Sequence, residues 1–333
     1  MNVAGFRVHA VLICGLLALV VAGIGVSQTL EPVSLRLDWL TISYHAPFYL
    51  ALENGYYRAA GIDLKLLEGK GSGGTIQLVA NGVDTFGLAD AAVVAKSVSQ
   101  GIPVKTVMGV FRKSAVAVVF PAQSSIRSPS DLKGKKVATC AGDSAVILFP
   151  AYLKAINLSP DDIKIVTVDC SAKYAVVAQG LADATLGFGP YGRTMFQAAG
   201  VSDIRKLDYA DAGVALPSHA IIASAKTIEG KPEVIRRFVG ATTRGWVEAR
   251  KNPGAAIEAM VRAVPLMKGK EAVLKTEFEG YVNYLDTPAT SGKPFGWQSA
   301  DDWKKAEAIL AQYMDLKPQP SVEAYFTNSF IAQ

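Results

Sequence analysis

The chain has 333 residues, of which 50% are hydrophobic and 19% are charged, and its formal net charge is +5. The positive excess is small and scattered along the chain, which argues against a nucleic-acid-binding protein. The apolar fraction predicts a folded protein with sizeable cores, and the length favours two domains over one.

The first thirty residues are typical of a secretory signal peptide. Arg7 is the only charged residue among them, and an uncharged run rich in Leu, Val, Ile and Gly covers 10–26. Gly25 and Ser27 are small residues with the spacing that a cleavage site requires, so we predict a signal peptide over 1–27 and a periplasmic mature protein. A retained membrane anchor is the alternative, because a run of this length is near the lower limit for crossing a bilayer.

Strand-like and helix-like segments then alternate, which is typical of a βαβ series. The predicted strands are 33–39, 62–67, 85–88 and 104–110, and the predicted helices between them are 46–53, 75–81 and 91–100. Pro47 suits a first helical turn, and Gly55 and Gly82 suit helix ends. This alternation predicts a mostly parallel sheet with helices on its faces.

A second series of the same kind begins near residue 115. Its predicted strands are 115–120, 136–139, 163–169 and 184–188, and its predicted helices are 144–156, 173–180 and 191–199. A strand over 220–224 is predicted to return the chain to the first lobe, and helices follow over 232–250, 254–264, 270–285 and 300–314. We therefore expect lobe one to comprise 28–118 and 216–333, with lobe two over 119–215.

The carboxyl ends of the first strands carry the residues that best suit ligand binding. Trp39 ends the first strand, and the glycine-rich loop Gly69-Lys70-Gly71-Ser72-Gly73-Gly74 follows the second. Ligands of open α/β sheets bind at this edge, and free backbone N–H groups at a helix start attract anions or ring acceptors. The sequence therefore predicts an aromatic plate and a polar cradle on one side of a cleft.

Two cysteines of the predicted mature chain, Cys140 and Cys170, each follow a predicted strand. If the two strands are adjacent and parallel, both sulfurs lie at the same sheet edge, and an exported protein keeps its disulfides. A pair of small buried residues is the alternative, because a disulfide needs a Cα separation of about 4.4–6.8 Å that the sequence does not show. A metal site is disfavoured, since no His or further Cys lies nearby in the sequence.

A set of motifs spread along the chain resembles those of one transport family. They are Leu37-Asp38-Trp39, His45 with Phe48-Tyr49-Leu50-Ala51, Glu53-Asn54-Gly55-Tyr56-Tyr57, Gly71-Ser72, Asp90, Asp131-Leu132-Lys133-Gly134-Lys135 and Phe295-Gly296-Trp297. They are similar to motifs of the ABC-importer solute-binding proteins of the NMT1/THI5-like family, whose members bind thiamine precursors, nitrate, sulfonates or taurine. The resemblance implies a type II periplasmic-binding-protein fold, with two α/β lobes joined by a two-strand hinge.

The resemblance also implies a set of ligand contacts, which are Trp39, His45, Ser72, Gly73, Gly74, Thr75, Asp90, Asp143, Ser144 and Tyr191. For Trp39 a place in the core is the alternative, and for His45 and Asp90 a helix cap is the alternative. Thiamine-precursor binders often carry a Trp-Glu pair late in lobe two, where this chain has Gly189-Pro190-Tyr191-Gly192.

The implied function is that of a periplasmic binding protein, not an enzyme. We expect it to capture a small heteroaromatic, pyrimidine-like molecule and to deliver it to an ABC permease in the inner membrane. A small anion (a sulfonate, taurine or nitrate), a pyrimidine-synthesising enzyme of the THI5 type and a sensor module are the alternatives. We expect no cofactor, no metal, no nucleic acid partner and a monomer.

Overall fold

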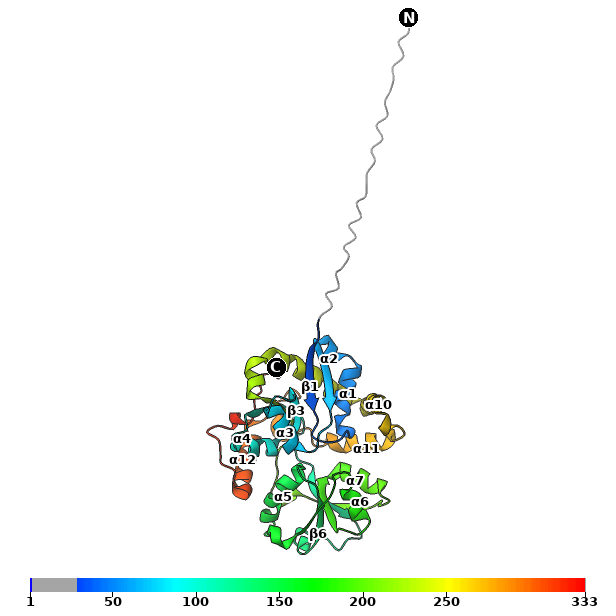
Figure 1. Ribbon diagram of the computed structural model, residues 1–333, viewed down its shortest axis with the longest axis vertical. Helices are drawn as coiled ribbons and strands as arrows, with labels where there is room; N and C mark the ends of the chain where they lie inside the picture. The colour runs from blue at the N-terminus through cyan, green and yellow to red at the C-terminus, as the bar shows by residue number, and fades with distance from the viewer. Residues whose placement is uncertain (2–28, 333) are drawn as a thin grey trace.

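The computed structural model describes Met1 and residues 29–332, and these form two lobes, each built on a five-stranded sheet (Figure 1). The residues that define the predicted signal peptide, from Arg7 to Ser27, lie outside this description. Among the described residues, no helix has the length and hydropathy needed to cross a membrane.

The sheet of lobe one has the strand order β2-β1-β3-β10-β4. The strands are β1 (Glu31–Arg36), β2 (Ile62–Leu67), β3 (Phe86–Asp90), β4 (Val104–Gly109) and β10 (His219–Ser224). Its helices are α1 (Ala46–Glu53), α2 (Tyr56–Ala59), α3 (Ser72–Ala80), α4 (Ala91–Ser99), α8 (Ala225–Gly230), α9 (Pro232–Lys251), α10 (Pro253–Ala263) and α11 (Glu271–Val282).

The sheet of lobe two has the strand order β7-β6-β8-β5-β9. Its strands are β5 (Val116–Pro121), β6 (Lys136–Thr139), β7 (Lys164–Thr167), β8 (Ala184–Phe188) and β9 (Ile204–Asp208). Helix α5 (Ser144–Ala155) covers one face, while α6 (Lys173–Ala178) and α7 (Gly189–Ala198) cover the other (Figure 1). Short 3-10 helices complete the fold: η1 (Ser43–His45), η2 (Pro129–Leu132), η3 (Pro160–Asp162), η4 (Tyr209–Ala212), η5 (Pro265–Met267), η6 (Pro288–Thr290) and η7 (Val322–Ala324).

In each sheet, the strand that follows a hinge crossing runs against the other strands. Strand β10 is antiparallel to β3 and β4, and β5 is antiparallel to β8 and β9. The remaining pairs, β1 with β2 and β3, and β6 with β7 and β8, are parallel. The predicted fold class, two α/β lobes with mostly parallel sheets and a two-strand hinge, is therefore confirmed.

The two crossing segments are hydrogen-bonded to each other. The backbone N–H groups of Val110 and Phe111 donate to the carbonyl oxygen of His219, at N···O distances of 2.8 and 2.9 Å. Ser114 N–H donates to the carbonyl oxygen of Leu216 at 3.0 Å. The crossing lies slightly earlier than the sequence predicts, because β5 pairs with the second sheet from its first residue, Val116. A continuous apolar run does not show where a strand changes its pairing partners.

Helix α12 (Ala300–Met314) contacts α4 of lobe one and α5 of lobe two, so it spans the two lobes on the side away from α11 (Figure 1). Trp303 of this helix stacks on Tyr325 and Phe326, with ring centres 5.6 and 5.8 Å apart. These rings belong to an apolar cluster that also contains Phe120 and Tyr152 of lobe two.

Candidate functional site

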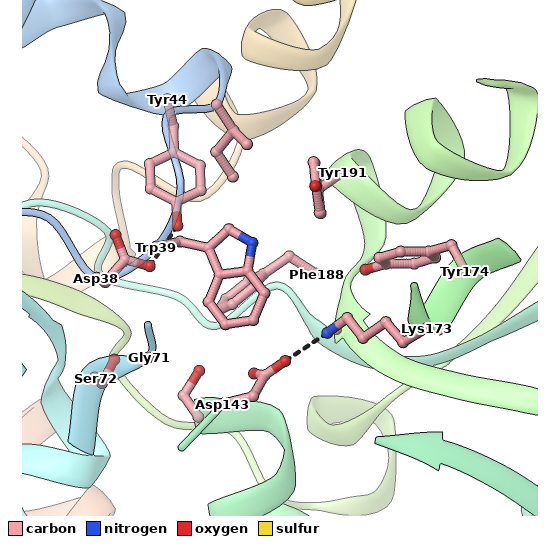
Figure 2. A pocket seen from close by; sticks show the side chains of 13 residues that line it. Asp38, Trp39, Tyr44, Gly71, Ser72, Asp143, Lys173, Tyr174, Phe188 and Tyr191 are labelled. Atoms are coloured by element: carbon pink, nitrogen blue, oxygen red, sulfur yellow. Dashed lines mark hydrogen bonds and ion pairs between the residues drawn. The ribbon is translucent and has the colours of Figure 1, made fainter. Parts of the chain in front are cut away.

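The cleft between the lobes has a free volume of about 20 Å³ and is lined by both of them (Figure 2). Lobe one contributes the loop after β1 and the start of α3, and lobe two contributes the starts of α5, α6 and α7. The lining residues are Asp38, Trp39, Ile42, Tyr44, Gly71, Ser72, Asp143, Ser144, Lys173, Tyr174, Gly187, Phe188 and Tyr191.

The two lobes touch at two glycines. A Cβ atom on Gly71 would lie only 2.1 Å from the carbonyl oxygen of Gly142, and one on Gly142 would lie 3.1 Å from the carbonyl oxygen of Lys70. Both glycines also have a positive φ, of 109° and 81°, which side chains disfavour. This close backbone contact brings the lobes together with the cleft between them.

Aromatic rings from both lobes form the apolar part of the cleft. Trp39 of lobe one extends toward lobe two. Across the cleft from it lie Tyr174 and Tyr191 (Figure 2). The rings of Tyr174 and Tyr191 are perpendicular, with an interplanar angle of 88° and centres 5.5 Å apart. The Nζ atom of Lys173 lies 5.2 Å from the centre of the Trp39 ring. Such rings suit a flat ligand, which they can contact by stacking or edge to face.

A buried ion pair forms the polar part of the cleft in lobe two. Asp143 caps α5, because its Oδ1 atom accepts a hydrogen bond from Ala145 N–H at 2.9 Å. Its Oδ2 atom accepts from Lys173 Nζ at 2.5 Å, and the same nitrogen donates to the carbonyl oxygen of Leu186 at 2.7 Å. Asp143 and Lys173 are only 4% and 2% exposed. The lysine charge is therefore neutralised inside the protein, and a buried pair of this kind is sensitive to loss of either member.

A disulfide joins the two loops that carry this ion pair. Cys140 and Cys170 are bonded, with their Cα atoms 5.0 Å apart, and they follow the parallel neighbours β6 and β7. Asp143 comes shortly after Cys140 in the chain, and Lys173 comes shortly after Cys170. Among the described residues, no group of three or more His, Cys, Asp or Glu side chains is arranged to hold a metal ion.

Asp38 is the centre of a buried polar network beneath the cleft. Its carboxylate accepts hydrogen bonds from the hydroxyl of Tyr44 at 2.6 Å and from the Nε2 atoms of His45 and His219 at 2.9 Å each. The Nδ1 atom of His45 accepts from Ile42 N–H at 3.1 Å, which fixes the proton of that ring on Nε2. Burial on its own would raise the pKa of Asp38, but the charge and hydrogen bond of His219, with His45, hold it far below its usual range.

The network continues from His219 to Asp90. Burial opposes a charge on His219, but Asp38 outweighs it and raises the pKa of this histidine. Ser218 Oγ lies 3.1 Å from His219 Nδ1 and also donates to Asp90 Oδ2 at 3.1 Å. Burial raises the pKa of Asp90 as well, although Ser218 and the N–H groups of α4 partly offset it. The network therefore joins the floor of the cleft to the return strand.

The structure separates the predicted contacts into two groups. Trp39, Ser72, Asp143, Ser144 and Tyr191 line the cleft. His45, Thr75 and Asp90 lie behind its wall: Thr75 donates to Leu37 O at 2.9 Å, and Asp90 caps α4 by accepting from Ala92 N–H at 3.0 Å. Gly73 and Gly74 do not line the cleft. They belong to α3, which begins at Ser72, whereas the sequence predicted a loop up to Thr75.

Asp38, Lys173, Tyr174 and Phe188 line the cleft and were not predicted as contacts. Asp38 belongs to the family motif Leu37-Asp38-Trp39 and precedes the predicted contact Trp39. Lys173 has a subtler signal, since it stands as far after Cys170 as Asp143 does after Cys140. Pairing the two cysteines would have placed both charges at one sheet edge.

Comparisons with known proteins agree with this architecture. A family model described as NMT1/THI5 like matches residues 42–256. The chain is 25% identical to the riboflavin-binding protein RibY of Chloroflexus aurantiacus over 310 residues, which are 91% of this chain and 87% of that protein. It is 26% identical to the formylaminopyrimidine-binding protein of Halalkalibacterium halodurans over 305 residues, which are 89% of each chain.

A solved structure shares the fold at lower sequence similarity. The alkanesulfonate-binding protein SsuA of Xanthomonas axonopodis, bound to MOPS, superposes with a TM-score of 0.68 at 18% identity. The match covers 89% of this chain and 98% of that one. The predicted resemblance is confirmed by the family model, which matches more than half of the chain. The protein belongs to the NMT1/THI5-like family.

Proposed function

We propose that the protein is the substrate-binding component of an ABC importer, which captures a small heteroaromatic molecule between its lobes and delivers it to a permease. The observation that carries this proposal is the cleft itself, where Trp39 of one lobe faces Tyr174 and Tyr191 of the other beside a neutralised ion pair. The two relatives named above bind riboflavin and a formylaminopyrimidine, by their names, and both ligands contain nitrogen heterocycles. Export to the periplasm follows from the same assignment.

The cleft is nearly closed in this structure. Its free volume is only about 20 Å³, whereas ligand pockets range over roughly 300–1,000 Å³. A ligand of any size therefore needs the lobes to separate at the contact between Gly71 and Gly142 before it can enter.

The charges of the cleft disfavour a sulfonate or nitrate. Among the residues that line it, Lys173 is the one cation, and Asp143 neutralises it. Arg112, a cation near the hinge that does not line the cleft, donates its hydrogen bonds to the carbonyl oxygens of Leu285 and Trp297. An anion in this cleft would face the carboxylates of Asp38 and Asp143 without a free positive partner.

A hydrolytic or pyrimidine-synthesising reaction is also disfavoured. A serine-hydrolase or THI5-type version of such chemistry uses a histidine that is free to accept a proton or to react. Within residues 29–332, the ring nitrogens of His45 and His219 all lie within hydrogen-bond distance of Asp38, Ile42 N or Ser218. Both rings are buried below the cleft. We therefore assign binding, and not catalysis, to the site.

Isothermal titration of residues 28–333 with pyrimidines, thiamine intermediates, riboflavin, sulfonates, taurine and nitrate tests the proposal. We expect a small nitrogen heterocycle to bind and, in a parallel unfolding experiment, to stabilise the protein by about 2.7 kcal/mol at a hundred times its Kd. Trp39→Ala removes the stacking ring and abolishes this binding, whereas Trp297→Ala, which is outside the cleft, leaves it intact. Binding of anions alone, or of no compound in the panel, would overturn the proposal.

A further inference from the structure

Helix α11 of lobe one packs against α7 of lobe two, outside the cleft. Glu277, Gly280 and Tyr281 are spaced by three and four positions, so they lie on the same face of α11. Gly280 lets the two helices approach closely, because a Cβ atom there would lie only 3.3 Å from the Cβ atom of Pro190 in α7. This face of α11 therefore meets lobe two directly.

The first turn of α7 receives a hydrogen-bond acceptor from lobe one. The first N–H groups of a helix have no acceptor within the helix, and the N-cap residue of α7 is Phe188, whose side chain has no acceptor atom. Tyr191 is the third residue of α7, and its backbone N–H donates to the hydroxyl oxygen of Tyr281. Helix α11 thus caps α7 across the interface between the lobes.

Glu277 forms a second polar contact on the same face of α11. Its Oε1 atom accepts a hydrogen bond from Ser43 Oγ at 2.6 Å, within lobe one. Its carboxyl group also accepts from the hydroxyl of Thr194 in α7. Because Ser43 already fixes this buried side chain, Glu277 can bond to lobe two without first being ordered.

Tyr191 connects the contact between the two helices to the cleft. Its side chain lines the cleft, and its hydroxyl oxygen accepts a hydrogen bond from the indole N–H of Trp39 on the opposite wall (Figure 2). One residue of lobe two is therefore bonded to lobe one twice, through its side chain at the cleft and through its backbone at α11. The cleft has a free volume of only about 20 Å³ while these bonds are made.

We propose that α11 and the start of α7 form an interlobe latch, which holds a share of the ligand-free protein in the closed form and positions Tyr191 at the cleft. The latch consists of Glu277, Gly280 and Tyr281 of lobe one and Pro190, Tyr191 and Thr194 of lobe two. Opening of the lobes breaks all of its contacts together, so a change at one of them alters the share of molecules in which every other contact is made. None of the three α11 residues lines the cleft, so the latch acts without touching a ligand.

Hydrogen exchange of the Tyr191 amide in the ligand-free mature protein measures the latch. Because α7 itself offers this N–H no acceptor, its protection depends on the bond to Tyr281 and hence on the closed form. Exchange resolved by residue with NMR should show at least tenfold protection of this amide relative to an unstructured peptide. Small-angle X-ray scattering of the same sample gives the radius of gyration.

A pair of substitutions at Thr194 tests whether the contacts act together. Thr194→Val removes the hydroxyl that donates to Glu277 and keeps the shape of the side chain, whereas Thr194→Ser keeps the hydroxyl. We expect Thr194→Val to lower the protection of the Tyr191 amide at least threefold and to raise the radius of gyration, because the closed form loses a hydrogen bond. Thr194→Ser should behave like the wild type.

Gly280→Leu tests the packing of the two helices. Its side chain would meet Pro190, so we expect the radius of gyration to rise and the protection of the Tyr191 amide to be lost. Leucine favours a helix more than glycine does, so α11 should stay folded, which circular dichroism checks. The matched control is Gly240→Leu, at an exposed glycine of α9 with nothing within 4 Å, which should leave both measurements unchanged.

The latch is refuted if Thr194→Val and Gly280→Leu keep the protection and the radius of gyration of the wild type. It is also refuted if the wild-type amide exchanges like that of an unstructured peptide, or if Thr194→Ser behaves like Thr194→Val. Loss of protection without a larger radius of gyration would assign the effect to fraying of α7, and would refute the latch as well. No ligand enters these measurements, so each of these outcomes leaves the proposed function standing.

Discussion

Removal of the disulfide between Cys140 and Cys170 should destabilise lobe two by an amount that depends on the length of the loop that it closes. The bridge closes a loop with a sequence separation of 30 residues. In the chain-entropy model, closing a loop of about 30 residues removes roughly 12 cal/mol/K from the unfolded chain, or about 3.6 kcal/mol at 25 °C. The double variant Cys140→Ala/Cys170→Ala should lose about this much stability.

Urea unfolding, followed by the circular dichroism of the mature protein, measures the effect. With an m-value of about 3 kcal/mol/M, a loss of about 3.6 kcal/mol moves the midpoint down by roughly 1.2 M. Wild-type protein that has been unfolded, reduced and refolded in a reducing buffer is the control, because it should match the double variant. The reductant should not change the double variant itself.

The same variant also has a consequence for binding. The bridge holds together the loops that carry Asp143 and Lys173, so its removal frees both sides of the ion pair. We expect the double variant to bind its ligand more weakly than the wild type in the absence of urea, where both proteins are folded. A midpoint shift below about 0.3 M would refute the entropy argument. Unchanged affinity would show that the ion pair keeps its geometry without the bridge.

Further predictions concern the contact between the lobes, the buried ion pair and the buried carboxyl group of Glu277 on α11. Gly71→Ala places a Cβ atom 2.1 Å from the Gly142 carbonyl, so the ligand-induced decrease in radius of gyration seen by small-angle X-ray scattering should disappear; Gly74→Ala, with nothing within 4 Å, should keep it. Lys173→Met leaves the partner carboxylate buried without a counter-charge and should cost about 3–5 kcal/mol in urea unfolding, most of which a second change, Asp143→Asn, should restore. Burial raises the pKa of Glu277 above its ordinary 4.5, so its contribution to stability is complete below pH 4.5 and is lost as the pH rises through the folded-state value. Glu277→Gln should therefore unfold at a higher temperature than the wild type at pH 7.5, and this advantage should shrink toward pH 4.5; an advantage that grows on acidification would contradict the assignment.

Much of the fold could be predicted because local signals and tertiary packing agree. Helices α1 and α12 have the predicted bounds, and in α12 the Ser299 side chain accepts a hydrogen bond from Asp302 N–H at the start. Strand β9 was not predicted, because its sequence Ile-Arg-Lys-Leu-Asp is that of a polar edge strand with only one fully buried residue. The start of α3 was also misplaced, since Gly73 and Gly74 favour a loop by propensity, yet both lie in its first turn.

The site was predictable only where a residue follows a strand. Trp39 and Asp143 stand at carboxyl ends of strands, and both line the cleft. Glu277, a buried carboxyl group of α11, gave no such signal, because it comes from a helix beyond the return strand and meets Ser43 only through packing. A contact between elements so far apart in the sequence depends on how the helices of lobe one pack, and a single sequence does not contain that information.

The network around Asp38 has a consequence for the cost of binding. Asp38 bonds to His219 across 181 positions of the chain and to His45 and Tyr44 nearby, so the floor of lobe one is cross-linked to the return strand. Because all four residues belong to lobe one, rotation of the lobes leaves this network intact. Trp39, the neighbour of Asp38, is therefore held in place before any ligand arrives. A ligand that stacks on it avoids the entropy of ordering that ring, and its binding energy is available to draw the second lobe inward.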